Sequence, residues 1–78
     1  MAELDLYGTS SCPYTAELRE ELEWRGVAFS YYDVEEDKEA LKRMLELTGN
    51  GRTVPVLALG HKVKQIGYQG RGCIVDAS

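Results

Sequence analysis

Cys12 is the residue of this 78-residue chain with the clearest chemical potential. Pro13 suits the first position of a helix, where its missing N–H is not needed, and this makes Cys12 the expected N-cap. The unpaired N–H groups of a helix N-terminus stabilise a thiolate and lower the pKa of such a thiol from about 8.5 to roughly 4–7. The polar neighbours in residues 10–15 (SSCPYT) predict an exposed, reactive thiol. The alternative is a buried structural cysteine.

The second cysteine, Cys73, lies far from Cys12 in the sequence. The two form either one structural disulfide or two thiols, and in a reducing cytosol thiols are the default. A closed zinc site needs four ligands, usually paired along the chain, and two cysteines with the single His61 do not supply them. We therefore expect no metal, and we expect His61 to be a solvated turn residue.

Residues 3–32 predict the elements that position Cys12. Alternating residues 3–7 predict a short strand, which glycine and polar residues end before Cys12. Residues 13–25 have the spacing of an amphipathic helix that ends at Gly26, with a Glu21–Arg25 pair on its surface. Its expected apolar face is Tyr14, Ala16, Leu18, Leu22 and Trp24.

The rest of the chain predicts a strand, a helix and a hairpin. Residues 27–34 are rich in strand formers, and residues 38–48 predict a helix with Asp37 as N-cap and Gly49-Asn50-Gly51 as terminator. Residues 54–59 and 62–66 predict antiparallel strands joined by a type II′ turn. Lys62 and Lys64 suggest that the last strand lies at an edge.

This order predicts an α/β fold with a four-stranded mixed sheet, β-α-β-α-β-β, and a truncated last helix. The first two strands should be parallel, with the hairpin added antiparallel to the same sheet. Helices should then cover the faces of the sheet.

Composition sets the broad class. With 44% hydrophobic and 28% charged residues, the chain should fold as one domain over residues 1–78. A net charge of −4 with scattered lysines and arginines argues against nucleic acid as a partner. No apolar run approaches the ~20 residues of a membrane span, and the first residues do not resemble a signal peptide. We expect a cytoplasmic monomer that does not bind membranes.

Two segments resemble the signatures of the glutaredoxin family. Residues 7–15 (YGTSSCPYT) are similar to its active-site segment, and residues 48–55 (TGNGRTVP) to its second signature. The resemblance spans nearly the whole chain and implies a thioredoxin-like fold. It also implies a glutathione-dependent thiol-disulfide oxidoreductase whose reacting atom is the Cys12 sulfur.

The family implies a role for individual residues. Pro55 would be a cis-proline beside the active site, leaving the backbone of Val54 free to pair with glutathione as a short antiparallel strand. Arg52 would bind a glutathione carboxylate, and the γ-glutamyl end would dock at Gly72-Cys73. The implied glutathione-binding residues are Tyr14, Arg52, Thr53, Val54, Pro55, Gly72 and Cys73.

Departures from the family pattern define the expected type. Thr15 stands where dithiol members have a second cysteine, so the site is expected to be monothiol, with Thr15 donating a hydrogen bond to the Cys12 thiolate. Thr9 stands where many relatives carry a glutathione-binding lysine. The Gly-Gly turn is altered to Gly70-Arg71-Gly72, and the end of the chain is shortened.

The leading function is reduction of glutathione-protein mixed disulfides by the Cys12 thiolate. The expected partners are glutathionylated or disulfide-containing proteins, with glutathione or another small thiol as co-substrate. Cys73 either resolves Cys12 through an internal disulfide or is an inert thiol. An alternative is a module that holds an iron–sulfur cluster with glutathione, and a third is a thioredoxin-fold protein that binds partners without turnover.

Overall fold

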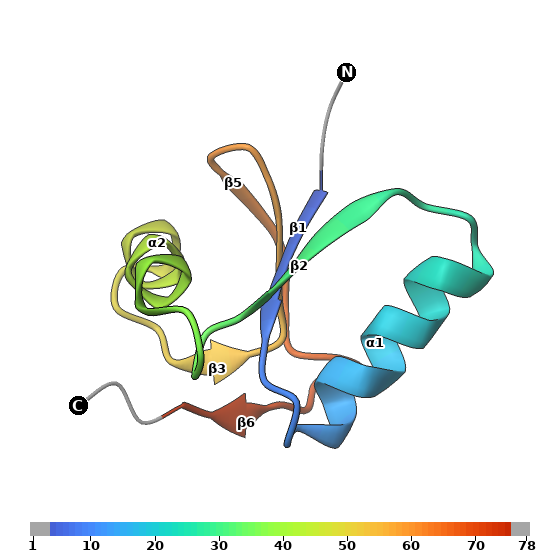
Figure 1. The fold of residues 1–78 in the computed structure, drawn as a ribbon, viewed down its shortest axis with the longest axis horizontal. Helices are drawn as coiled ribbons and strands as arrows, with labels where there is room; N and C mark the ends of the chain where they lie inside the picture. Colours follow the sequence, from blue (N-terminus) through green and yellow to red (C-terminus); the bar gives the residue numbers. More distant parts are fainter. Residues whose placement is uncertain (1–3, 76–78) are drawn as a thin grey trace.

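A four-stranded sheet with one helix on each face forms the body of the molecule (Figure 1). The computed structural model describes residues 4–75. The elements are β1 (Leu4–Gly8), α1 (Pro13–Trp24), β2 (Phe29–Asp33), α2 (Lys38–Thr48), β3 (Thr53–Val54), β4 (Val56–Leu59), β5 (Lys62–Ile66) and β6 (Cys73–Ile74).

The sheet has the order β2-β1-β4-β5. β1 pairs parallel with β2 and antiparallel with β4, and β5 pairs antiparallel with β4 at the edge. This confirms the predicted mixed sheet and its topology. The predicted strand over residues 54–59 is divided at Pro55, which has no N–H to donate to a ladder. Its first part becomes β3, which pairs antiparallel with β6 in a separate two-stranded sheet.

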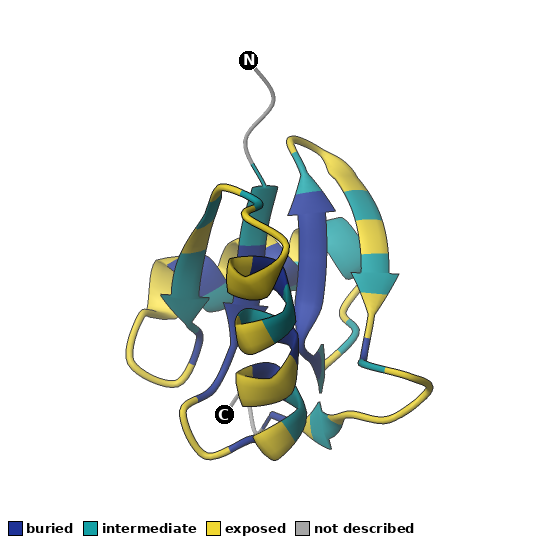
Figure 2. Cartoon of the chain, turned by 90° about the vertical axis from the view of Figure 1, so that its right-hand side faces the viewer, coloured by how far each residue is buried: buried dark blue, intermediate teal, exposed yellow. Residues whose placement is uncertain are grey.

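The sheet buries a cluster of apolar side chains on each face, because successive residues of a strand point to opposite sides. In β1, Leu6 belongs to the cluster under α1 and Tyr7 to the cluster under α2. Burial is concentrated in the central strands (Figure 2). The α1 cluster consists of Leu6, Leu18, Leu22 and Leu57, and the α2 cluster of Tyr7, Cys12, Val34, Ala40, Met44, Val54, Val56, Ala58 and Val75.

The prediction for the inner face of α1 was partly wrong. Leu18 and Leu22 are buried as expected, but Trp24 is 90% exposed. Two residues along a helix is a rotation of about 200°, so Trp24 lies on the opposite face from Leu22. Ala16 is exposed as well, and the buried residue of the first turn is Thr15.

The limits of α2 agree with the predicted range of 38–48. The Asp37 carboxylate accepts hydrogen bonds from the backbone N–H groups of Glu39 and Ala40, at 3.0 and 3.1 Å. Gly49 ends the helix in a left-handed conformation, with φ of 67°. Neither helix in the described part of the chain is long and apolar enough to cross a membrane.

The predicted truncated last helix does not form within residues 67–75, and residues 76–78 lie outside the described part of the chain. Over residues 72–75 the chain runs extended, and Cys73–Ile74 form the strand β6 beside β3. Val75, which follows, is buried in the α2 cluster. This tail is therefore attached to the body of the fold both by backbone pairing and by a core side chain.

Candidate functional site

Cys12 and Cys73 are joined by a disulfide, with their Cα atoms 6.0 Å apart. The default expectation of two thiols is thus wrong for this structure, and of the two alternatives the disulfide is the one observed. The expected exposure of Cys12 is also wrong, since Cys12 is 1% exposed. Its burial has a direct cause, because the bonded residue Cys73 and the tail that carries it lie against it.

Cys12 has the predicted position at the N-terminus of α1. Its backbone is extended, with φ −90° and ψ 116°, and Pro13 follows as the first helical residue. The Cys12 carbonyl accepts the N–H of Ala16 at 3.2 Å, whereas its side chain makes no capping hydrogen bond. The first turn carries no acidic residue. The partial positive charge of this helix end is therefore available to a thiolate at Cys12.

Two carboxylates that no sequence motif indicates contact the loop that precedes Cys12. Asp33 accepts the backbone N–H of Ser10 at 3.3 Å, and Glu35 accepts the hydroxyl of Ser11 at 3.4 Å. The parallel pairing of β1 and β2 brings them here, because both strands end at the same edge of the sheet. Their negative charge opposes a thiolate, and solvent screens the exposed Glu35 more than the half-buried Asp33.

Thr15 lies one turn along α1 from Cys12 and is 1% exposed. Its hydroxyl has no hydrogen-bond partner. The side chain packs against Gly8, where an added Cβ would lie 2.7 Å from Thr15 Oγ1. In this disulfide form the predicted hydrogen bond from Thr15 to Cys12 is absent, and the buried hydroxyl retains an unused donor.

Val54 belongs to the buried cluster that contains Cys12, and the next residue, Pro55, is fully buried. The Val54–Pro55 peptide bond is cis, as the family resemblance implied. Val54 is fully buried in the cluster that contains Cys12. Across the β3–β6 pair, Val54 is opposite Cys73 and Thr53 is opposite Ile74. Next to this pair, the N–H of Val75 donates to the carbonyl of Arg52 at 2.8 Å.

Gly72 packs its Cα directly against β3. A Cβ added at Gly72 would lie 2.5 Å from the carbonyl oxygen of Val54 and 2.8 Å from Thr53 Cγ2. Heavy atoms in real contacts do not approach this closely, and a backbone oxygen has little freedom to move away. The position therefore requires glycine as long as the tail is paired.

The remaining predicted residues surround the same place. Tyr14 is half-buried against the cluster that includes Cys12, and the Arg52 side chain is exposed. Thr53 is half-buried in β3. The structure thus brings together the predicted site residues from three segments, which are residues 12–15, 52–55 and 72–73. His61 is exposed on the β4–β5 turn, as expected.

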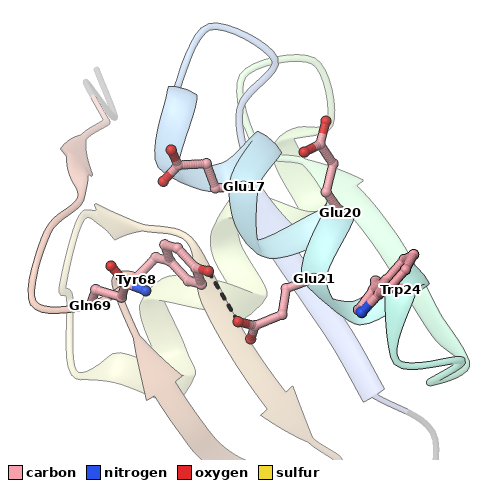
Figure 3. Close-up of a pocket in the computed structure, with 6 residues that line it drawn as sticks. All are labelled: Glu17, Glu20, Glu21, Trp24, Tyr68 and Gln69. Atoms are coloured by element: carbon pink, nitrogen blue, oxygen red, sulfur yellow. Dashed lines mark hydrogen bonds between the residues drawn. The ribbon is translucent and has the colours of Figure 1, made fainter.

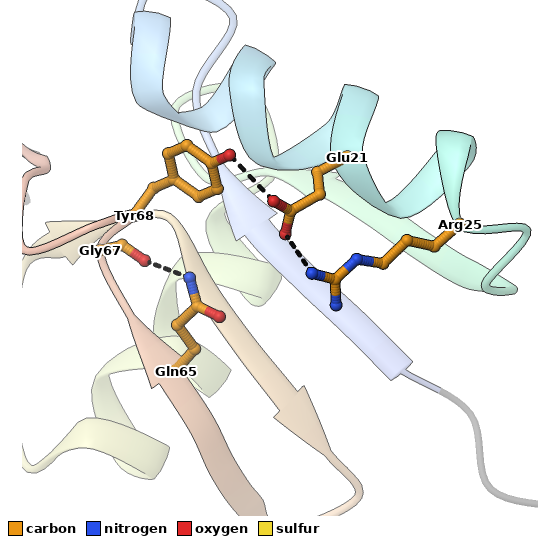
Figure 4. Close-up of polar contacts among 5 residues, drawn as sticks. All are labelled: Glu21, Arg25, Gln65, Gly67 and Tyr68. Atoms are coloured by element: carbon orange, nitrogen blue, oxygen red, sulfur yellow. Dashed lines mark hydrogen bonds and ion pairs between the residues drawn. The ribbon is translucent and has the colours of Figure 1, made fainter.

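A shallow hollow on α1 is separate from this site. It is lined by Glu17, Glu20, Glu21, Trp24, Tyr68 and Gln69 (Figure 3), none of which is a predicted site residue. Glu21 accepts the Tyr68 hydroxyl at 3.0 Å and forms an ion pair of 3.7 Å with Arg25 (Figure 4). The hydrogen bond to this carboxylate raises the pKa of Tyr68. The Tyr68–Glu21 hydrogen bond ties the segment after β5 to α1.

Over residues 4–75, no group of three or more His, Cys, Asp and Glu side chains is arranged to hold a metal ion. The two sulfur atoms of the disulfide lie in different settings. One lies at a helix N-terminus, and the other is carried by a paired strand.

Comparison with known proteins agrees with this geometry. Residues 4–64 match the family model for glutaredoxin. The fold is similar to the crystal structure of a glutaredoxin from Archaeoglobus fulgidus, with a TM-score of 0.72 and 31% sequence identity. The similarity covers 88% of this chain and 78% of the archaeal one. A search of curated proteins finds no match.

Proposed function

The chain belongs to the glutaredoxin family of thioredoxin-fold thiol-disulfide oxidoreductases, and on this premise we propose that it acts on glutathione-protein mixed disulfides through a monothiol active-site motif, with Thr15 in place of the second cysteine. The observation that carries the proposal is the position of Cys12 as the N-cap of α1, in the buried cluster that also contains Val54. We propose the cytoplasm as its location.

The first step is attack by the Cys12 thiolate on the glutathionyl sulfur of the mixed disulfide. A bond forms between Cys12 and glutathione, and the bond to the substrate protein breaks. The substrate's sulfur leaves as a thiolate with the electron pair and takes a proton from water. The helix N-terminus favours the thiolate that performs this attack.

The second step needs another thiol, and we propose Cys73. Its thiolate attacks the Cys12 sulfur, forms the internal disulfide and releases glutathione as a thiolate. The observed Cys12–Cys73 bond supports this role, because it places the two sulfur atoms within bonding reach in the folded chain. An external thiol then reduces the internal disulfide.

The groups around Cys12 support binding of glutathione. Arg52 has an exposed side chain, as capture of a solvated carboxylate requires. Thr15 carries an unpartnered hydroxyl one turn from Cys12, and we propose that it donates to the thiolate once the disulfide is reduced. An iron–sulfur cluster would need Cys12 as a free thiolate ligand. The proposed attack needs the same free thiolate, so the Cys12–Cys73 bond does not distinguish the two functions, and the iron–sulfur module stays an alternative.

Deglutathionylation of a glutathionylated peptide, with glutathione as reductant, tests the proposal. The chain should release the peptide thiol catalytically, and Cys12→Ser should abolish the reaction. Cys73→Ser should keep the first step, because its substitution leaves the attacking sulfur in place. Absence of activity in the wild-type chain, or equal activity after Cys12→Ser, would overturn the proposal.

A further inference from the structure

The tail occupies the place that the proposed function assigns to glutathione. The backbone edge of β3, formed by Thr53 and Val54, pairs antiparallel with Cys73–Ile74. Cys73 lies opposite Val54, and its sulfur is bonded to Cys12. A glutathione bound as the family resemblance implies would use the same backbone groups of Val54, in the same antiparallel sense, and would direct its cysteine sulfur to the same atom.

The residue before Cys73 has the local shape of the γ-glutamyl unit. In glutathione the amide carbonyl that precedes the cysteine is attached to an unbranched CH₂ carbon, because the glutamate is linked through its side chain. Gly72 likewise has a CH₂ at this point. A branched carbon there would bring a Cβ to 2.5 Å from the Val54 carbonyl oxygen. Most peptide cysteines follow a branched α carbon and meet this obstacle.

We propose that Gly72-Cys73 is a tethered substitute for the γ-glutamyl-cysteine part of glutathione, and that the β3 edge accepts a cysteine only when the carbon before its amide is unbranched. The tail and glutathione then exclude each other at the site, so Gly72 and Cys73 compete with glutathione and do not bind it as the family resemblance implies. This inference rests on the proposed function for the identity of the competing ligand. It adds a specificity rule, which favours γ-glutamyl-cysteine and Gly-Cys over other cysteine sequences.

Exchange at the site is a replacement of one strand by another. When the Cys73 thiolate attacks the Cys12 sulfur of a glutathionylated chain, the Cys12–Cys73 bond forms. The bond to glutathione breaks, and glutathione leaves as a thiolate with the electron pair. Val75 is buried in the core next to the tail strand, so it keeps Cys73 near the site during the exchange. The tail therefore competes at a high effective concentration.

Two short peptides test the rule for the edge. Mixed disulfides are formed between Cys12 of the Cys73→Ser chain and either N-acetyl-Gly-Cys-amide or N-acetyl-Ala-Cys-amide, in redox buffers of the two peptides. Intact mass spectrometry after acid quenching gives the equilibrium ratio. The Gly-Cys adduct should be favoured at least about tenfold, since overpacking against backbone is costly. Equal populations of the two adducts would overturn the proposal.

A second experiment tests the competition in the chain itself. In glutathione buffers, the ratio of internal disulfide to glutathionylated Cys12 should fall at least about tenfold in Gly72→Ala. Ile74→Ala, a change at a 75% exposed position of the same strand, should leave the ratio within about twofold. An unchanged ratio in Gly72→Ala would overturn the inference.

The same experiment separates this inference from the proposed function. If Cys12 of Cys73→Ser never takes up glutathione, the proposed use of glutathione fails, and with it the competition. Equilibration of the internal disulfide with dithiothreitol then shows whether Gly72→Ala still weakens it. If Gly72→Ala lowers the equilibrium constant for the internal disulfide by about tenfold or more, the requirement for an unbranched carbon at the β3 edge stands. If that constant does not change, the requirement is overturned too.

Discussion

Cys73 lies directly opposite Val54 in the antiparallel β3–β6 pair, and the same residue is bonded through its sulfur to Cys12. Its backbone and its side chain are thus fixed by two different parts of the chain. Val54 in turn shares a buried cluster with Cys12. The register of the two-residue strand β6 therefore decides whether the Cys73 sulfur faces the N-terminus of α1. A shift by one residue would turn the Cys73 side chain away.

Thr15→Val tests the role of the unpartnered hydroxyl. Thr15 is 1% exposed and its hydroxyl has no partner, so removing the hydroxyl should raise the free energy of unfolding of the oxidised chain by about 1 kcal/mol. In the reduced chain the thiolate loses a hydrogen-bond donor, and alkylation of Cys12 by iodoacetamide near neutral pH should slow. An unchanged alkylation rate would contradict the proposed hydrogen bond.

Thr48→Val is the matched control for that experiment. The Thr48 hydroxyl donates to the carbonyls of Met44 and Gly51, at 2.8 and 3.0 Å, at the end of α2. The same substitution here should lower the free energy of unfolding by about 1 kcal/mol. It should leave the Cys12 alkylation rate unchanged. If the free energy of unfolding and the alkylation rate change in the same way in both variants, the hydroxyl of Thr15 does not differ from the hydrogen-bonded hydroxyl of Thr48 as described.

Leu22→Ala and Trp24→Ala test which face of α1 packs on the sheet. Leu22 is 5% exposed within the α1 cluster, and its truncation should cost about 2–5 kcal/mol in the free energy of unfolding. Trp24 is 90% exposed, so Trp24→Ala should change stability by no more than about 0.5 kcal/mol. Urea denaturation followed by circular dichroism measures both. A larger loss of stability in Trp24→Ala than in Leu22→Ala would mean that the Trp24 face of α1 packs on the sheet.

The Tyr68–Glu21 hydrogen bond predicts a pH dependence of stability. The Glu21 carboxylate raises the pKa of Tyr68 above its ordinary value of about 10. This contribution to stability is therefore fully present below about pH 10, and it is lost as the pH rises through the raised pKa of the folded chain. Absorbance titration of the phenols should show a lower pKa for Tyr68 in Glu21→Gln. No difference between the titrations of Glu21→Gln and wild type would contradict the contact.

Much of the fold follows from local signals in the sequence. Asp37 and Gly49 define α2 because a side-chain cap and a left-handed glycine are local features that need no tertiary contacts. The topology followed from the order of the elements. Trp24 has the hydrophobicity of a core residue, but its angular position, about 200° from Leu22 around the helix, puts it on the exposed face.

The sequence predicts which segments form the candidate site, but not the contacts between them. Residues 12–15 and 52–55 were identified from motifs, and the structure brings them together. The strand at Cys73–Ile74 was not predicted, because a two-residue strand has too few residues to show a period of two and forms only where β3 offers an edge. Asp33 and Glu35 were missed for a similar reason, since only the parallel pairing of β1 and β2 brings them to the active-site loop.

The central claim is that Cys12 receives the glutathionyl group and Cys73 then displaces it. The most direct measurement is intact mass spectrometry of reduced chains mixed with one equivalent of a glutathionylated peptide and quenched with acid. Cys73→Ser should accumulate one glutathionyl group on Cys12, Cys12→Ser should carry none, and the wild-type chain should end as the internal disulfide with glutathione released. Glutathionylation of Cys12→Ser as fast as that of Cys73→Ser, or a stable glutathionyl group on the wild-type chain, would contradict the account.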